Sequence, residues 1–391
     1  MTDTGYLNKG VSPIKAIAMQ MITNNPSKSS FVIFTLAFFL LIIQSAWAQK
    51  IDLAITGANL IDGTSAPLKE STTILVCDGQ IEAVASDNNL EVPEHARVIV
   101  AGGEYVLPGF ADMHVHCGSG GFKSAPLDRI LRRYLFYGVT TIFNVGGSNG
   151  ETSLIQDLRS KVASCEMMAP RIYATGNHLT IPGSHPVGTI LHLPPDADSA
   201  SYDWSRHGID VVKTNSEAQE AVQAKAKAGM DAIKIMVESG PPPFGDDHPQ
   251  MPPEMISVVV KEASSHDLPV VAHVSTLDKL EDAVENGVHA IMHAVERAPL
   301  PGSKHWNRMR SRDIFYVPTL SLYSRLMTDR WTHQGARKDP FLQSGITTRI
   351  LKSLDEWEPA TASMPDAKKD RLWKNLWNHR ARQTSRSADH G

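Results

Sequence analysis

The chain has 391 residues, of which 42% are hydrophobic and 20% are charged, which is the balance of a globular protein. Its length allows one large domain and one small domain. The 38 basic and 42 acidic side chains leave a formal net charge of −4, so no surplus of basic charge points to nucleic acid as a partner. The three cysteines are widely spaced and form no CxxC pair, which argues against a disulfide framework and a structural zinc ribbon.

The N-terminus has the layout of an export signal. A basic segment precedes an apolar run over residues 31–43, and Ala46 and Ala48 place small side chains where a signal peptidase reads them. A membrane anchor is the alternative, but a run of 13 residues is short for a membrane span. We therefore expect residues 1–48 to be a signal peptide that is cleaved near Ala48. The mature protein would then be periplasmic or secreted, and no stable membrane span would remain.

Residues 49–106 have the features of a small β domain. Asp62-Gly63 and Asp78-Gly79 lie between segments of strand character, and an Asp-Gly pair flanked by strands is typical of a hairpin. The expected strands are Ile51–Thr56, Thr73–Val76, Gln80–Ala85 and Arg97–Val100.

Residues 107–391 form a second region, in which short apolar strands alternate with amphipathic helical segments. The expected strands are Gly109–His116, Thr140–Val145, Arg171–Gly176, Ala232–Val237, Pro269–Val274, Ala290–His293 and Phe315–Leu320. The expected helices include Ser216–Ala228, Glu254–Ser264 and Leu277–Asn286, and Gly229 and Gly287 mark helix ends. This alternation implies parallel strands in an α/β fold. Seven units favour a (β/α)8 TIM-type barrel that lacks its eighth strand. A doubly wound sheet is disfavoured because no glycine-rich phosphate loop follows the first strand.

Two histidines at the end of the first barrel strand point to a metal site. Side chains alternate along a strand, so His114 and His116 face one side while Val115 faces the other. Two imidazoles on one face, at the carboxyl end of a barrel strand, can chelate a metal ion. Two exposed loop histidines are the alternative, but the preceding Leu-Pro-Gly-Phe favours the metal site.

Three further residues extend this pattern. Lys234 lies between β-branched residues in the middle of an expected strand, where a buried ammonium is costly without a partner or modification; snorkelling to the strand end is the alternative. His273 and His293 each close a short apolar strand. One such histidine is more often structural, but two at consecutive strand ends after His-x-His favour metal ligands.

The set His114-x-His116, Lys234, His273 and His293 resembles that of the metal-dependent amidohydrolase superfamily. The phrases LPGFADMHVH, GVTTIFNVG, DAIKIMVESG and VVAHVSTLDKLEDAVENGVHAIMH resemble its imidazolonepropionase-like and Xaa-Pro dipeptidase-like branch, over roughly residues 51–325. The resemblance implies a small N-terminal β-sandwich domain and two divalent metal ions, with zinc expected. It implies that His114 and His116 bind the buried ion and that His273 and His293 bind the other. Lys234, carboxylated by carbon dioxide, would bridge the two ions.

The activity implied is hydrolysis of a carbon–nitrogen bond in an amide, dipeptide or cyclic amide by a metal-activated water. The family's remaining catalytic group is an aspartate at the end of strand eight. No such position is found here, since Asp355, Asp366 and Asp370 lie in polar helical surroundings. We therefore identify no catalytic residue and expect a truncated chain with little activity. The alternative is a disabled or fragmentary relative that binds metal or ligand without turnover.

Several other residues are candidates for contact with substrate. Asn177-His178 and Ser184-His185 follow the third barrel strand, with His185 the preferred candidate; Glu238 and Tyr323 follow the fourth and seventh strands. A small molecule or dipeptide is the expected partner, and assembly as a homo-oligomer is left open. The substrate itself is not determined, because specificity lies in the loops.

Overall fold

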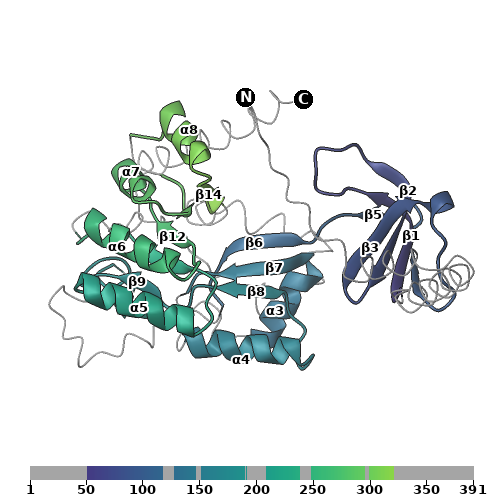
Figure 1. Ribbon diagram of the computed structural model, residues 1–391, viewed down its shortest axis with the longest axis horizontal. Coiled ribbons are helices and arrows are strands. Elements are labelled where there is room, and N and C mark those ends of the chain that lie inside the picture. Colours follow the sequence, from purple (N-terminus) through teal and green to yellow (C-terminus); the bar gives the residue numbers. More distant parts are fainter. Residues whose placement is uncertain are drawn as a thin grey trace, which may run out of the picture. The chain divides into compact units, whose positions relative to one another are not determined.

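The computed structural model divides the chain into two compact units, residues 1–108 and 109–391 (Figure 1). It describes residues 51–117, 127–146, 151–189, 191, 208–237, 248–295 and 299–320. The expected signal peptide and residues 321–391, which include Asp355, Asp366 and Asp370, lie outside these residues. Among the residues described, no helix has the length and apolar character needed to cross a membrane.

The first unit contains a mixed β-sheet. Its elements are β1 (Leu53–Leu60), β2 (Lys69–Cys77), β3 (Gln80–Ser86), the 3-10 helix η1 (Asp87–Asn89), β4 (Arg97–Val100) and β5 (Tyr105–Val106). The strand order is β3-β2-β1-β4, with β5 also paired to β1. The pairs β1–β2 and β2–β3 are antiparallel, whereas β4 and β5 run parallel to β1. This is the only sheet among the described residues of the unit, and they include no second layer that would complete the expected β-sandwich.

The two Asp-Gly pairs behave differently. Asp78-Gly79 joins β2 to β3 in a two-residue turn between the paired Cys77 and Gln80, and both turn residues have positive φ, as a primed hairpin turn requires. Asp62-Gly63 instead lies in a longer loop, because β1 ends at Leu60 and β2 begins at Lys69. The Asp62 carboxylate accepts from the Thr64 backbone N–H at 3.0 Å and from Lys69 at 2.8 Å, so it shapes this loop. The hairpin predicted at Asp78-Gly79 is confirmed, and Asp62-Gly63 also lies between two paired antiparallel strands, β1 and β2, although in a longer connection.

The second unit is an α/β fold of parallel strands. One sheet has the order β6-β7-β8 and the other β10-β9-β11-β12-β13-β14, and every pair in both is parallel. The strands are β6 (Phe110–Val115), β7 (Val139–Asn144), β8 (Arg171–Ala174), β9 (His178–Thr180), β10 (Ile209–Val211), β11 (Ile233–Met236), β12 (Val270–His273), β13 (Ala290–Met292) and β14 (Phe315–Val317). The helices are α3 (Leu127–Phe136), α4 (Glu151–Ala163), α5 (Asn215–Lys227), α6 (Pro253–Ser264), α7 (Leu277–Glu285) and α8 (Ser303–Ser311). The predicted α/β class with parallel strands is confirmed.

Hydrogen bonds connect β8 of one sheet to the start of β11 in the other. The Asp231 backbone N–H, just before β11, donates to Ala174 O at 2.8 Å, and the Asp231 carboxylate accepts from the Ala174 N–H at 2.7 Å. The Arg159 guanidinium of α4 binds the same carboxylate and also donates to Ile172 O of β8. These bonds tie β8, the last strand of one sheet, to the residue that precedes β11 in the other sheet.

Side-chain alternation gives the strands of the second unit two differently packed faces. On one face, Ile233, Ile235, Val270, Ala272 and Ile291 pack against the helices, in a core that includes Ile256 and Val259 of α6. Helices α5, α6 and α7 lie side by side over these strands (Figure 1). Each fully buried Ile or Val in such a core contributes about 1.5–3 kcal/mol.

The opposite face carries a smaller cluster, which we call the inner cluster: Phe143, Val145, Ala232, Val271, Ala290 and Met292, with Val317 against it. These residues come from β7, β11, β12, β13 and β14 or their immediate ends, so the strands converge on a shared interior. Residues two positions farther along a strand lie on the same face, one step nearer its carboxyl end. Lys234 and His273 occupy these positions beyond Ala232 and Val271.

The two glycines predicted to end helices do so. Helix α5 ends at Lys227 and α7 at Glu285, and Gly229 and Gly287 follow with φ of +71° and +83°. A side chain in this left-handed region is unfavourable, which explains why glycine occupies both positions.

Candidate metal centre

His114 and His116 lie at the carboxyl end of β6 with their Nε2 atoms 3.2 Å apart. His116 Nδ1 is 2.5 Å from Gly146 O, and a carbonyl oxygen only accepts, so Nδ1 carries the proton and Nε2 presents its lone pair. Two nitrogens that share a tetrahedral zinc ion at about 2.0–2.1 Å lie roughly 3.4 Å apart. The spacing and tautomer of this pair therefore fit a shared metal ion.

A chain of imidazole rings extends from this pair. The ring centroids of His114 and His293 are 4.6 Å apart, those of His293 and His273 are 4.2 Å apart, and those of His273 and His185 are 4.6 Å apart. These residues come from β6, the end of β13, the end of β12 and the loop after β9. Tertiary folding thus gathers the four histidines predicted as ligands and the preferred substrate-binding histidine in one place.

His293 is held in an unusual backbone conformation. Its φ is +76°, a region that a non-glycine residue rarely adopts without support. Two bonds supply that support: the His293 N–H donates to Val317 O at 2.9 Å, and Nδ1 lies 2.9 Å from Thr319 Oγ1. Such conformations cluster at functional sites because the surrounding structure fixes them there. Here the conformation directs the ring towards the other imidazoles.

Lys234 is enclosed beside these rings. It is 1% exposed, so its amine does not reach water and the snorkelling alternative is wrong. Its charge adds to burial in lowering the pKa of His114, His273 and His293, each well below the ordinary value, and burial is the larger cause. Burial and the Lys234 charge also lower the pKa of His116, although the bond to Gly146 O opposes them. Lowered values leave these imidazoles neutral at pH 7, which is the form that binds metal.

The structure adds residues that support the site and that sequence reasoning did not single out. Gly146 O orients His116, Thr319 contacts His293, and the buried Asn144 side chain accepts from the Cys117 N–H at 2.9 Å. Only Asn144 carries a sequence signal, as a polar residue at the end of an apolar strand. Gly146 acts through its backbone carbonyl and Thr319 through its hydroxyl, and neither residue stood out in the sequence.

The remaining candidates differ in how much the structure says of them. His185 is buried, with Nδ1 2.6 Å from Thr189 Oγ1. His178 is buried at the first position of β9, and the pKa of its ring is also well below the ordinary value, mainly because of burial. Glu238 and Tyr323 lie outside the described residues, as does any aspartate that would follow an eighth strand.

Asp52, Cys77 and Asp78 of the first unit form another close group of metal-binding atoms, within 4.8 Å of one another. The turn between β2 and β3 accounts for it, because the Asp52 carboxylate accepts from the Asp78 backbone N–H at 2.8 Å. The group is therefore explained as a turn contact.

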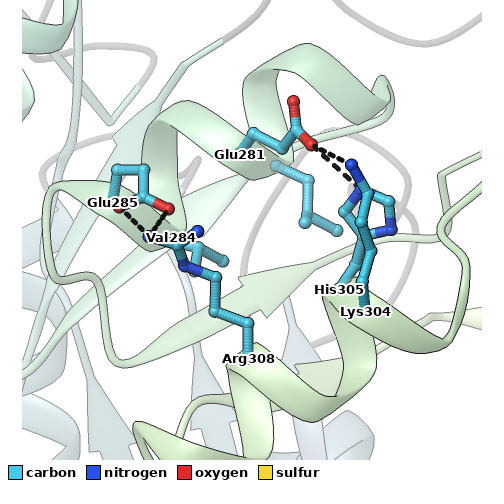
Figure 2. Close-up of a pocket in the computed structure, with 7 residues that line it drawn as sticks. Glu281, Val284, Glu285, Lys304, His305 and Arg308 are labelled. Atoms are coloured by element: carbon cyan, nitrogen blue, oxygen red, sulfur yellow. Dashed lines mark hydrogen bonds and ion pairs between the residues drawn. The ribbon is translucent and has the colours of Figure 1, made fainter.

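A pocket of about 330 Å³ lies between helices α7 and α8, away from the inner face of the strands (Figure 2). Figure 2 shows Glu281 and Glu285 of α7 facing Lys304, His305 and Arg308 of α8. Glu281 binds His305 at 2.9 Å and Lys304 at 3.7 Å, and Glu285 pairs with Arg308. Because the acidic and basic groups neutralise each other, we interpret this network as a clamp between the two helices and not as a ligand site.

The geometry can be compared with known proteins. The sequence model of the amidohydrolase family matches residues 105–309. The chain belongs to the amidohydrolase family. Members of this family hydrolyse carbon–nitrogen bonds and generally use metal ions.

Ochratoxinase from Aspergillus niger is 24% identical over 314 residues, which cover 72% of this chain and 61% of the relative. The chain thus spans less than two thirds of that curated relative. A crystal structure of a prolidase complexed with N-methylphosphonate-L-proline has a TM-score of 0.61 at 23% identity, covering 83% of this chain and 72% of that one. A Xaa-Pro dipeptidase structure with bound methionine has a TM-score of 0.59 at 22% identity, covering 83% and 76%. The TM-scores show a shared fold, and at identities below 25% the structural matches show the fold alone.

Proposed function

We propose that this amidohydrolase is a metal-dependent enzyme that hydrolyses the carbon–nitrogen bond of a small amide, dipeptide or cyclic amide. The observation that carries the proposal is the set of imidazoles around Lys234 at the carboxyl ends of parallel strands, with two Nε2 atoms 3.2 Å apart. Active sites of parallel barrels lie at this end of the strands. The parallel strands of the described residues are accordingly proposed to belong to a (β/α)8-type barrel.

The residues divide into two proposed ligand groups. His114 and His116 would hold one divalent ion, and His273 and His293 a second, with zinc favoured by the imidazole ligands. Lys234 would join the two ions as a carbamate formed with carbon dioxide, which replaces a buried positive charge by an anionic ligand. When bound, the metal ions would lower the pKa of a coordinated water and polarise the substrate carbonyl.

The chain's own residues have distinct tasks in this proposal. His116 is fixed in one tautomer by Gly146 O, and the His293 ring is set by its backbone and by Thr319. The inner cluster closes the space beneath the rings and excludes water from below. His185, which stacks on His273, would contact the substrate.

Short peptides are the first substrates to test, since a prolidase and a Xaa-Pro dipeptidase share the fold and ochratoxinase is a relative in sequence. The chain would be purified with zinc, its metal content measured, and hydrolysis assayed with dipeptides, including Xaa-Pro, and with N-acyl amino acids. About two ions per chain are expected.

Matched variants make the assay specific. Lys234→Met and His273→Asn should lower turnover by more than about 100-fold, since even partners outside the ligand set are commonly worth 10–100-fold. His266→Asn, just after the end of the outer helix α6, serves as the control because that side chain is exposed and pairs with Glu262 of α6. Turnover that persists in metal-free protein or in Lys234→Met would refute the proposal.

We also propose that the protein is exported, on the basis of the expected signal peptide. N-terminal sequencing of the protein recovered from the periplasm or medium should begin near Gln49. An intact Met1 on active cytoplasmic protein would refute export.

A further inference from the structure

His178 was predicted with Asn177 as a residue that could contact substrate, but the proposed function gives its ring no task. It is 4% exposed, and neither Nδ1 nor Nε2 has a hydrogen-bond partner among the described residues. Buried polar side chains in folded proteins are nearly always paired, so a ring with two unpaired nitrogens requires an explanation. A neutral imidazole has one N–H donor and one acceptor nitrogen to satisfy.

The strand register places His178 beside Lys234. Leu179 of β9 is paired with Ile235 of the parallel strand β11, so the residues that precede them, His178 and Lys234, are neighbours across the two strands. Neighbouring residues in paired strands point to the same face, and the strands lie about 4.8 Å apart. Both side chains therefore point to the face that carries the inner cluster.

The backbone around His178 leaves room for its ring. A side chain on Gly146 would come within 2.6 Å of Gly176 O and 3.2 Å of His178 Nδ1, and both glycines have positive φ. The same Gly146 carbonyl orients His116. The His178 ring thus lies between Lys234 and the Gly146 backbone, which orients the proposed metal ligand His116.

A lysine carbamate provides the group that the ring lacks. The neutral amine of Lys234 adds to the carbon of carbon dioxide; a C–N bond forms, one C=O electron pair moves to oxygen, and one amine proton passes to water. The product is a carbamate with one negative charge shared by its two oxygens. An imidazole N–H can donate to such an oxygen in a charge-assisted hydrogen bond.

We propose that His178 is a positioning residue for Lys234, whose ring N–H donates to the carbamate and holds it between the two metal sites. This inference rests on the proposed function, because it requires that Lys234 is carboxylated. It assigns His178 no contact with the substrate.

The test compares two substitutions at this position in the full chain. His178→Phe keeps a planar ring and removes both nitrogens, whereas His178→Gln keeps a donor and an acceptor. His266→Phe, at an exposed position just after α6, controls for loss of an imidazole elsewhere. Each protein is equilibrated with ¹³C-bicarbonate and zinc, the carbamate is quantified by ¹³C NMR, and zinc affinity is measured by competition with a chelator. Circular dichroism confirms that each variant is folded.

The expected result is a loss of carbamate signal and of zinc affinity of about 10–100-fold in His178→Phe, which is the usual effect of removing a group that orients a ligand. His178→Gln should stay within about threefold of the unsubstituted chain, and His266→Phe should match it. Unchanged carbamate and zinc binding in His178→Phe would overturn the inference and leave the proposed function standing. Equal losses in both His178 variants would mark His178 as a metal ligand itself and overturn the positioning role. If the unsubstituted chain forms no carbamate and binds no zinc, the inference and the proposed function both fail.

Discussion

Gly146 offers a sharp test of how the backbone shapes the metal centre. Its φ is +91°, and an added Cβ would lie 2.6 Å from Gly176 O. Because that oxygen belongs to the backbone, the clash could be relieved only by a shift of the backbone itself. Gly229 is a matched control, because its φ is +71° and nothing lies within 4 Å of an added Cβ. Alanine at either position costs about 1–2 kcal/mol for the left-handed backbone. Only Gly146→Ala adds the steric term, on the order of 1–3 kcal/mol.

The assay is urea and thermal unfolding of both variants, followed by circular dichroism. Gly146→Ala should be less stable than Gly229→Ala by about 2 kcal/mol, or roughly 4–8 °C in Tm for a domain of 150–250 residues. It should also bind zinc more weakly, since the Gly146 carbonyl orients His116. The entropic gain from replacing glycine in the unfolded chain is shared by both variants and cancels. Equal unfolding free energies would refute the idea that close approach at Gly146 supports the site.

Three further outcomes follow from the contacts described. Asp231→Ala should lower the free energy of unfolding by about 1.5–3 kcal/mol, because the carboxylate binds both the Ala174 N–H and the Arg159 guanidinium. Chemical denaturation measures this change, and a value below about 0.5 kcal/mol would contradict the prediction. The pKa of Asp62 is lowered mainly by its bond to Lys69, so this carboxylate stabilises the fold at pH values above its ordinary pKa of about 3.9. The contribution is lost as pH falls through the lower pKa of the folded state. Asp62→Asn should therefore flatten the acid side of a plot of unfolding free energy against pH, and an unchanged plot would count against this reasoning. Removal of zinc by a chelator should lower Tm, by the equivalent of about 4 kcal/mol if zinc is present at 1,000 times its dissociation constant; a Tm that does not depend on zinc concentration would argue against a metal centre in the folded protein.

Sequence and structure agree best where the signal is local. Apolar runs and amphipathic segments predicted β6, β11, β12 and β13 to within about two residues at either end, which is the usual uncertainty of an element boundary. The Asp78-Gly79 turn was also predictable, because a two-residue hairpin requires positive φ at both positions. The length of the loop that contains Asp62-Gly63 could not be predicted, because it depends on where β1 and β2 pair.

The candidate metal ligands could be predicted from the sequence, because side chains alternate along a strand and the ends of apolar strands can be recognised locally. His114 and His116 share a face by the period of a strand, and Lys234 is conspicuous as a charge in an apolar run. The hydrogen-bond partners of these ligands could not be predicted from the sequence. The carbonyl of Gly146 and the hydroxyl of Thr319 act from residues about thirty positions away in the chain, and neither residue type is distinctive.

The sequence by itself thus determined the α/β class, the parallel strands and the residue types that can bind metal, because these depend on hydrophobic period and side-chain chemistry over a few residues. Only the tertiary structure decided which imidazoles meet, which tautomer His116 adopts, and that His178 lies beside Lys234. These features depend on the register between strands that are distant in the chain. That register is set by packing of the whole domain, and no short stretch of sequence contains it.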